Sequence, residues 1–225
     1  MSPNLTIREK ELFDNPTPRV PISLVLDISA SMDGEPINEL NKGVQQFLTE
    51  MKENPYTATS GEICIVTFND YANCVAEFRS AEQQSCNEFY ATGSTSMNDG
   101  VNLALQQLAK AKEEFKNAGI EYFQPWMILM TDGEPTQNID SSSKSSTDLV
   151  NDGKLVVFPV GIGERADMGT LERYSPKTPP LKLKGLKFSE FFEWLSASAA
   201  KVSSESSPGD KIKLDTEKMK SWTEF

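Results

Sequence analysis

Oxygen-bearing side chains alternate directly after an apolar segment in the first part of the sequence. Asp27, Ser29 and Ser31 follow residues 20–26, which read VPISLVL. In an extended or curled loop, side chains two positions apart can converge on one point. Hard divalent cations prefer such oxygens, and Mg²⁺ takes about six of them at about 2.1 Å while it keeps some waters. The pattern therefore predicts a loop that binds a divalent cation.

Two other segments supply oxygen donors of the same kind. Thr95 stands in GSTS just before a predicted helix, and Asp132 follows the apolar segment 125–130. In a doubly wound sheet, ligands bind outside the carboxyl ends of the strands, where the strand order reverses. If the two apolar segments are neighbouring strands, Asp27 and Asp132 face one crevice, and Thr95 can reach it. The alternative is that these residues only cap helices, since Ser, Asp and Thr are common at helix N-caps.

Short apolar segments alternate with amphipathic helical patterns through most of the chain. Near-continuous apolarity predicts strands buried on both faces, and spacings of three and four predict helices. The predicted strands are 20–26, 62–68, 73–78, 125–130, 154–163 and 181–186, and the main helical patterns are 36–51, 101–115 and 188–202. The tight turn between the second and third strands makes that pair antiparallel. The fold class is α/β: a Rossmann-like, doubly wound, mostly parallel sheet with one antiparallel edge strand and helices on both faces.

Finer features of the pattern give further expectations. The Ser/Asn/Thr-rich segment 136–147 is predicted to loop into a short helix near 147–151. Pro159 interrupts an apolar strand, which favours a place near the sheet edge or an irregular strand end. The stripe of Phe188, Phe191, Phe192 and Leu195 is predicted to be core, with an exposed docking face as the alternative.

A single domain is expected, with an extension at each end. Residues 1–19 form an N-terminal arm, 20–203 form the domain, and 204–225 form a polar tail packed on it. Ile212, Leu214 and Trp222 are the tail residues expected to make that contact.

The order and spacing of the motifs resemble those of von Willebrand factor A (VWA) domains. D-x-S-x-S after an apolar strand, Thr95 before a helix and Asp132 in T-D-G match the metal-ion-dependent adhesion site of that family. The segments PTPRVPISLVLDISASM, QPWMILMTDGEPT and PLKLKGLKF are similar to the bacterial TerY-type subgroup over roughly residues 15–210. The resemblance implies that the two serines bind the ion directly. It also implies that Thr95 binds directly or through water, and that Asp27 and Asp132 act largely through water.

The resemblance also implies a biological setting. TerY-type proteins are associated with tellurite resistance, stress and phage-defence gene sets, often beside a protein kinase and a PP2C-type phosphatase. One departure is Ala30, where many relatives have glycine. Alanine is small, and it is costly there only if the loop needs a positive φ.

The donor set itself favours binding over catalysis. Two carboxylates and three hydroxyls leave the shell of a dication open, so that the Asp or Glu of a partner protein could complete it. Mg²⁺ is the expected ion, with Mn²⁺ and Ca²⁺ as alternatives. The chain has no histidine, which excludes Ser-His-Asp chemistry and a histidine general base. The protein is therefore expected not to be an enzyme.

Two other functions stay open beside the binding module. A metal-dependent hydrolase of the phosphatase kind would use Asp27 as its nucleophile. A haloacid-dehalogenase-like enzyme needs a second aspartate two positions later, where this chain has Ser29. The second alternative function is that of a scaffold that binds no metal.

Charge and hydropathy indicate which classes of partner and which cellular compartment to expect. The net charge of −11 argues against nucleic acid and anionic membranes, since both attract basic surfaces. The start of the chain lacks an apolar signal region, and no apolar run approaches the roughly 20 residues of a membrane span. A cytoplasmic protein is therefore expected. Cys64, Cys74 and Cys86 are predicted to be reduced and partly buried, with a redox role as the alternative.

Overall fold

A seven-stranded sheet forms the centre of the computed structural model, which describes residues 6–210, 219 and 222–224. The strand order is β3-β2-β1-β4-β5-β6-β7. The strands are β1 (Val20–Asp27), β2 (Gly61–Phe68), β3 (Ala72–Ser80), β4 (Trp126–Thr131), β5 (Val156–Ile162), β6 (Leu181–Leu183) and β7 (Thr223–Glu224). Strands β2, β1, β4, β5 and β6 run parallel, and β3 pairs antiparallel with β2. The predicted doubly wound α/β fold is confirmed, and the short antiparallel β7 extends the sheet at its other edge.

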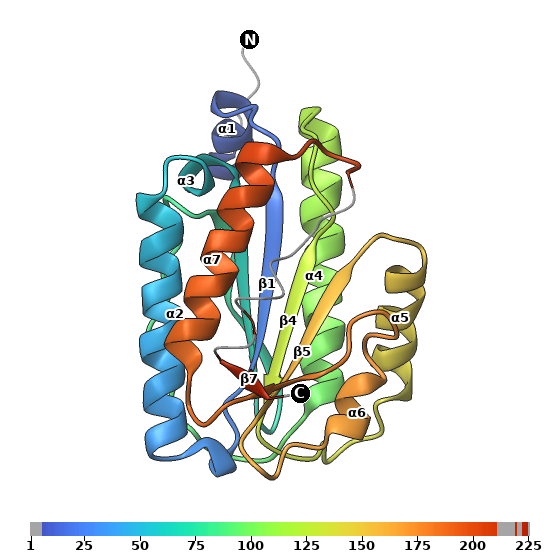
Figure 1. Ribbon diagram of the computed structural model, residues 1–225. Coiled ribbons are helices and arrows are strands. Elements are labelled where there is room, and N and C mark those ends of the chain that lie inside the picture. The colour runs from blue at the N-terminus through green and yellow to red at the C-terminus, as the bar shows by residue number, and fades with distance from the viewer. Residues whose placement is uncertain (1–5, 211–218, 220–221, 225) are drawn as a thin grey trace.

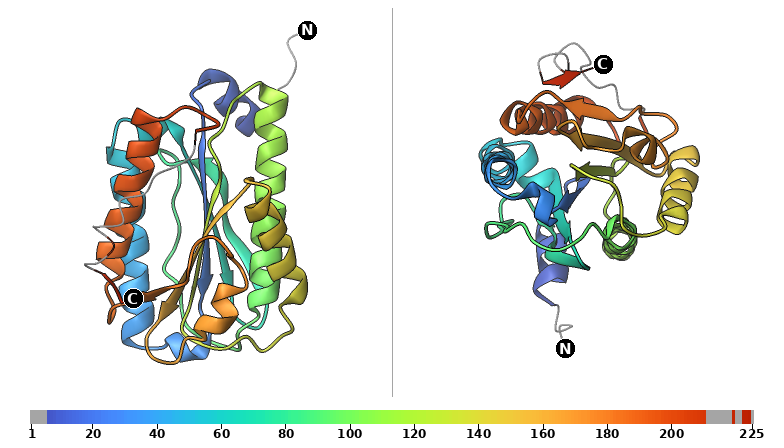
Figure 2. Two further views of the ribbon diagram at one scale, coloured as in Figure 1. Left: turned by 45° about the vertical axis from the view of Figure 1, so that its right-hand side comes forward. Right: turned by 90° about the horizontal axis from the view of Figure 1, so that it is seen from below.

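Helices cover both faces of this sheet (Figures 1 and 2). The helices are α1 (Ile7–Asp14), α2 (Glu35–Glu53), α3 (Thr57–Ser60), α4 (Met97–Ala118), α5 (Asp140–Asn151), α6 (Met168–Glu172) and α7 (Phe188–Glu205), with a 3₁₀ turn at Ala30–Met32. Helices α2 and α7 lie side by side on one face, and α4 and α5 cover the other. Among the described residues, none of the helices has the combination of length and apolar character that a membrane span requires.

The core consists of two apolar layers, one on each side of the sheet. The stripe of Phe188, Phe191, Phe192 and Leu195 is completely buried, which confirms that it belongs to the core. Gly43 lets α2 approach α7 closely, because a Cβ at this position would lie 2.6 Å from the Phe192 ring. On the other face, α4 packs against β1, β2 and β3 with its apolar residues. The strands between the layers are therefore buried on both sides, as their continuous apolar sequences require.

Two local predictions needed correction. The helix expected near 147–151 begins at Asp140, so most of the Ser-rich segment is helical. Its serines pack inward: Ser142 Oγ lies 2.9 Å from Tyr174 Oη, and Ser146 Oγ donates to the Tyr174 carbonyl at 2.8 Å. Pro159 lies in β5, which is an interior strand of the sheet. However, β6 pairs with β5 only from Val160 onward, so the proline precedes that ladder.

Trp222 and Met219, near the C-terminus, pack into the core of the domain. Trp222 is 1% exposed, and its ring lies 5.0 Å from that of Phe191 and 5.3 Å from that of Trp194. The Trp222 carbonyl also accepts a hydrogen bond from the Lys184 amide at 2.8 Å. Ile212 and Leu214, which were also expected to pack, lie outside the described residues.

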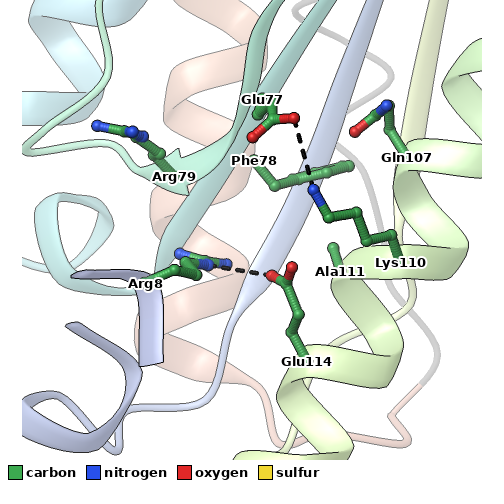
Figure 3. Close-up of a pocket in the computed structure, with 8 residues that line it drawn as sticks. All are labelled: Arg8, Glu77, Phe78, Arg79, Gln107, Lys110, Ala111 and Glu114. Carbon is green, nitrogen blue, oxygen red and sulfur yellow. Dashed lines mark hydrogen bonds and ion pairs between the residues drawn. The ribbon is translucent and has the colours of Figure 1, made fainter. Parts of the chain in front are cut away.

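A buried ion-pair network fixes the N-terminal segment, in which the sequence pattern had not indicated a helix. Glu62 of β2 is completely buried, and its carboxylate accepts from Arg8 of α1 at 2.9 Å and from Arg19 at 3.0 Å. Arg8 also reaches Glu114 of α4 at 3.1 Å, beside a cavity of about 100 Å³ (Figure 3). Thr6 is the N-cap residue of α1 and forms a capping box with Glu9. Residues far apart in sequence therefore hold α1 in place.

The Glu62→Gln variant is expected to lose about 3–5 kcal/mol of unfolding free energy, because it removes the buried carboxylate that Arg8 and Arg19 share. Urea unfolding followed by circular dichroism measures the loss. The control is Asp148→Asn, which breaks the exposed pair with Lys144 and should cost much less. Equal losses in the two variants would contradict the importance of the network.

The Trp222→Ala variant is expected to lose about 3–5 kcal/mol of unfolding free energy, because it opens a cavity among aromatic rings. The same urea titration gives the value. Tyr56→Ala, which removes a ring that is 55% exposed, is the matched control and should change stability little. An unchanged midpoint for Trp222→Ala would contradict a stabilising role for the Trp222 ring.

Candidate metal centre

Asp27 lies at the end of β1 and is completely buried. Its Oδ1 accepts a hydrogen bond from the Ser29 amide at 2.8 Å, and its Oδ2 accepts one from Thr131 Oγ1 at 2.6 Å. Burial raises the pKa of Asp27. The hydrogen bonds from Ser29 and Thr131 partly offset this increase, and the nearby negative charge of Asp132 adds to it. A carboxylate in this position favours a neighbouring cation, because the cation would stabilise its charged form.

The two serines connect Asp27 to the second aspartate. Ser29 Oγ and Ser31 Oγ lie 3.1 Å apart, and Ser31 Oγ donates to Asp132 Oδ1 at 2.5 Å. Ser29 is 2% and Asp132 5% exposed, while Ser31 is half-buried. Asp132 directly follows β4, the strand paired with β1. The structure therefore brings together four of the five predicted side chains through a continuous chain of hydrogen bonds.

Thr95 lies in a loop that backbone hydrogen bonds join to both of these segments. The Ala30 amide donates to the Gly93 carbonyl at 3.0 Å, which joins the Thr95 loop to the serine loop. The Thr95 carbonyl accepts from the Thr136 amide at 3.1 Å, which joins it to the Asp132 loop. Thr95 itself is 7% exposed. The three loops predicted to meet do meet at one edge of the sheet.

The turn between β2 and β3 supports the Thr95 loop from the other side. Asp70 Oδ1 accepts from the Ser94 amide at 2.9 Å, and the Asn69 carbonyl accepts from the Ser96 amide at 2.8 Å. Gly93 has a φ of +78°, and a Cβ there would lie 2.6 Å from the Asp70 carboxylate. Only glycine allows this close approach with an unstrained backbone.

The sequence interpretation missed two further residues at this edge. Thr131 orients Asp27, and its position at the end of a strand beside β1 was the signal for that role. Arg165 extends from the loop after β5, and its guanidinium lies 3.5 Å from Asp132 Oδ2 while 74% of its side chain is exposed. No local pattern indicates Arg165, because its contact depends on the sheet order.

The spacing of the oxygens suits a small dication. An octahedral Mg²⁺ site with ligands at about 2.1 Å places adjacent oxygens about 3.0 Å apart. The Ser29–Ser31 separation of 3.1 Å is close to that value. Among the described residues, no cluster of three or more Cys, Asp or Glu side chains is arranged to hold a metal. Any ion here would therefore rely on hydroxyls and waters as well as on the two carboxylates.

Known proteins are similar to this chain in sequence. A curated relative from Synechocystis sp., described as uncharacterised, is 26% identical over 161 residues, which cover 68% of this chain and 35% of that protein. Inter-alpha-trypsin inhibitor heavy chain H1 of Sus scrofa is 26% identical over 160 residues, which cover 67% of this chain and 17% of the heavy chain. The chain thus spans about a third or less of the length of these relatives.

Solved structures show the same fold. The pilus adhesin SpaC from Lactobacillus rhamnosus GG superposes with a TM-score of 0.66 at 15% identity, over 84% of this chain and 32% of the adhesin. A von Willebrand factor type A structure from Catenulispora acidiphila gives a TM-score of 0.60 at 18% identity, over 82% of this chain and 43% of that one. The family model of the von Willebrand factor type A domain matches residues 22–181. This match takes in more than half of the 225 residues, and the chain therefore belongs to the von Willebrand factor type A domain family.

Proposed function

We propose that this protein is a metal-dependent protein-binding adaptor. VWA domains commonly mediate metal-dependent interactions between proteins. The observation that carries the proposal is the hydrogen-bonded chain from Asp27 through Ser29 and Ser31 to Asp132. It assembles hydroxyl and carboxylate oxygens from two loops that are about a hundred positions apart in the sequence.

The five residues of the site have different roles in this proposal. Ser29 and Ser31 bind the ion directly through their hydroxyls, and Thr95 binds it directly or through water. Both oxygens of Asp27 already accept hydrogen bonds, which favours its action through water. Asp132 holds Ser31 and orients further waters. Mg²⁺ is the proposed ion, with Mn²⁺ or Ca²⁺ as alternatives, because few carboxylates are present.

The partner is proposed to bind the ion with the carboxylate of an Asp or Glu. The protein's own ligands leave the shell open, and the incoming carboxylate replaces a water. Arg165 supports this choice of partner, because its exposed guanidinium lies beside Asp132 and can pair with an approaching acid. Such a local positive charge matters in a chain whose net charge is −11. The protein acts by binding and not by turnover.

The biological setting is proposed from the TerY-type resemblance. We place the protein in the bacterial cytoplasm, in a tellurite-resistance, stress or defence system, with a protein kinase or PP2C-type phosphatase as partner. The domain spans 20–203, the arm is 1–19, and the tail is 204–225. Nucleic acid and membranes are not partners in this proposal.

Isothermal titration of the full chain with Mg²⁺ or Mn²⁺ should show a single site. The Ser29→Ala and Asp132→Ala variants should lose at least about tenfold in affinity, since each removes an oxygen of the cluster. Asp33→Ala is the matched control, because Asp33 is an exposed acid in the same loop and should leave binding unchanged. The metal-free scaffold is favoured instead if millimolar metal gives no binding to the wild-type chain.

Partner capture should depend on the ion. Affinity purification from the source cells is expected to recover at least one protein that chelator removes and that Mg²⁺ restores. Asp27→Ala and Ser29→Ala should lose the same protein, while Asp33→Ala keeps it. Capture that persists in chelator and in both site variants would contradict the adaptor mechanism even if the ion binds.

A further inference from the structure

Two cysteine side chains meet between the strands of the β2–β3 hairpin. Cys64 of β2 is completely buried, and Cys74 of β3 is half-buried. Their sulfurs lie 3.9 Å apart, although the residues are ten positions apart in the sequence. Both thiols are free and face the α4 side of the sheet. The site described above uses neither of them.

Solvent can reach one member of the pair. Strand β3 is the edge of the sheet, and Cys74 is half-buried while its neighbours Asn73 and Val75 are exposed. Cys64 lies between the sheet and α4, where a reagent in solution cannot reach it directly. An oxidant from solution therefore meets Cys74 first.

Electrostatics give the two sulfurs different reactivities. The hydrogen bond from the Cys64 thiol lowers the pKa of Cys74, and Lys110 of α4 contributes in the same direction. Burial and the negative charge of Glu77 oppose this shift, and Glu77 is itself paired with Lys110 at 3.5 Å (Figure 3). Hydrogen bonding to Cys74 and burial both raise the pKa of Cys64. Of the two thiols, Cys74 therefore loses its proton more readily, and it is also the more accessible sulfur.

The backbone around the pair can adapt to a shorter sulfur–sulfur distance. A disulfide requires the sulfurs to approach to about 2.0 Å. The β2–β3 ladder has register irregularities between Ile63 and Ile65 and between Ile65 and Val66, directly beside Cys64. Such irregularities bend and twist an edge strand locally. Small side-chain rotations, together with local bending of the edge strand, allow the sulfurs of Cys64 and Cys74 to come within bonding distance.

We propose that Cys64 and Cys74 form a reversible redox site that a hydroperoxide oxidises to an intramolecular disulfide. The Cys74 thiolate attacks the O–O bond, which gives a sulfenic acid and releases the alcohol, or water for hydrogen peroxide, after protonation by solvent. The Cys64 thiol then attacks the sulfenic sulfur, so that the S–S bond forms and water leaves. The two thiols lose two electrons, and the hydroperoxide gains them. A dithiol reductant reverses the reaction by exchange.

Cys86 provides an internal control. It is half-buried like Cys74, but it packs against the core on the opposite face of the sheet. Burial raises its pKa, and its sulfur accepts a contact from Gln45 Nε2 at 3.5 Å. Cys86 and Cys74 are thus similarly exposed to solvent, but Cys86 lies on the opposite face of the sheet from the Cys64–Cys74 pair.

To test this proposal, the reduced protein is treated with equimolar hydrogen peroxide. Its remaining free thiols are then alkylated, and its peptides are mapped by mass spectrometry. Of the three cysteines, Cys86 alone should remain alkylatable, and cleavage at Asp70 should yield two peptides joined through Cys64 and Cys74. Dithiothreitol should restore all three thiols. In Cys64→Ser, dimedone should trap a sulfenic acid at Cys74, and Cys86→Ser should behave like the wild type.

Two results would overturn the proposal. One is a wild-type chain in which Cys86 is oxidised as readily as Cys74. The other is a wild-type chain in which no linked peptide forms at peroxide levels that oxidise exposed thiols. Both are measured on the unmodified sequence, so misfolding of a variant cannot explain them.

Discussion

The parallel pairing of β1 with β4 is the constraint on which the candidate metal centre depends. The register from Ile22↔Trp126 to Leu26↔Met130 ends both strands at the same edge and places Asp27 beside Thr131. A slip of one residue would turn the side chains of β4 to the opposite face. Asp132 would then no longer reach Ser31. The oxygen cluster is therefore a product of sheet register as much as of the D-x-S-x-S loop.

The features that the sequence predicts well are those that depend on local patterns. Buried parallel strands are nearly continuous apolar runs, and α2, α4 and α7 carry apolar side chains at helical spacing. Asp27, at the end of β1, is followed closely by Ser29 and Ser31, so that the proximity of the three residues follows from chain geometry alone. Thr95 and Asp132 could be added because the carboxyl ends of parallel strands meet at one edge.

The features that the sequence does not predict depend on long-range contacts. Serines are weak helix formers, yet α5 is stabilised by a hydrogen bond between the Ser142 and Tyr174 hydroxyls and by one from Ser146 to the Tyr174 carbonyl. Helix α1 is held by Arg8 reaching Glu62, which is 54 positions away. Arg165 reaches Asp132 only because β5 lies beside β4. In each case the stabilising partner lies far away in sequence, so that no short window contains the signal.

The hairpin β2–β3 connects the two proposals spatially. Its turn at Asn69 and Asp70 holds the Thr95 loop, and its strands carry the thiol pair formed by Cys64 and Cys74. The metal centre and the thiol pair are nevertheless expected to act independently, because thiol oxidation needs no metal and metal binding needs no thiol.

Anomalous scattering from a crystal of the protein soaked in Mn²⁺ would locate the bound ion. One strong peak is expected within about 2.3 Å of the Ser29 and Ser31 hydroxyl oxygens, with waters between the ion and Asp27. A peak bound elsewhere, or no peak at this edge of the sheet at saturating Mn²⁺, would contradict the proposed metal centre.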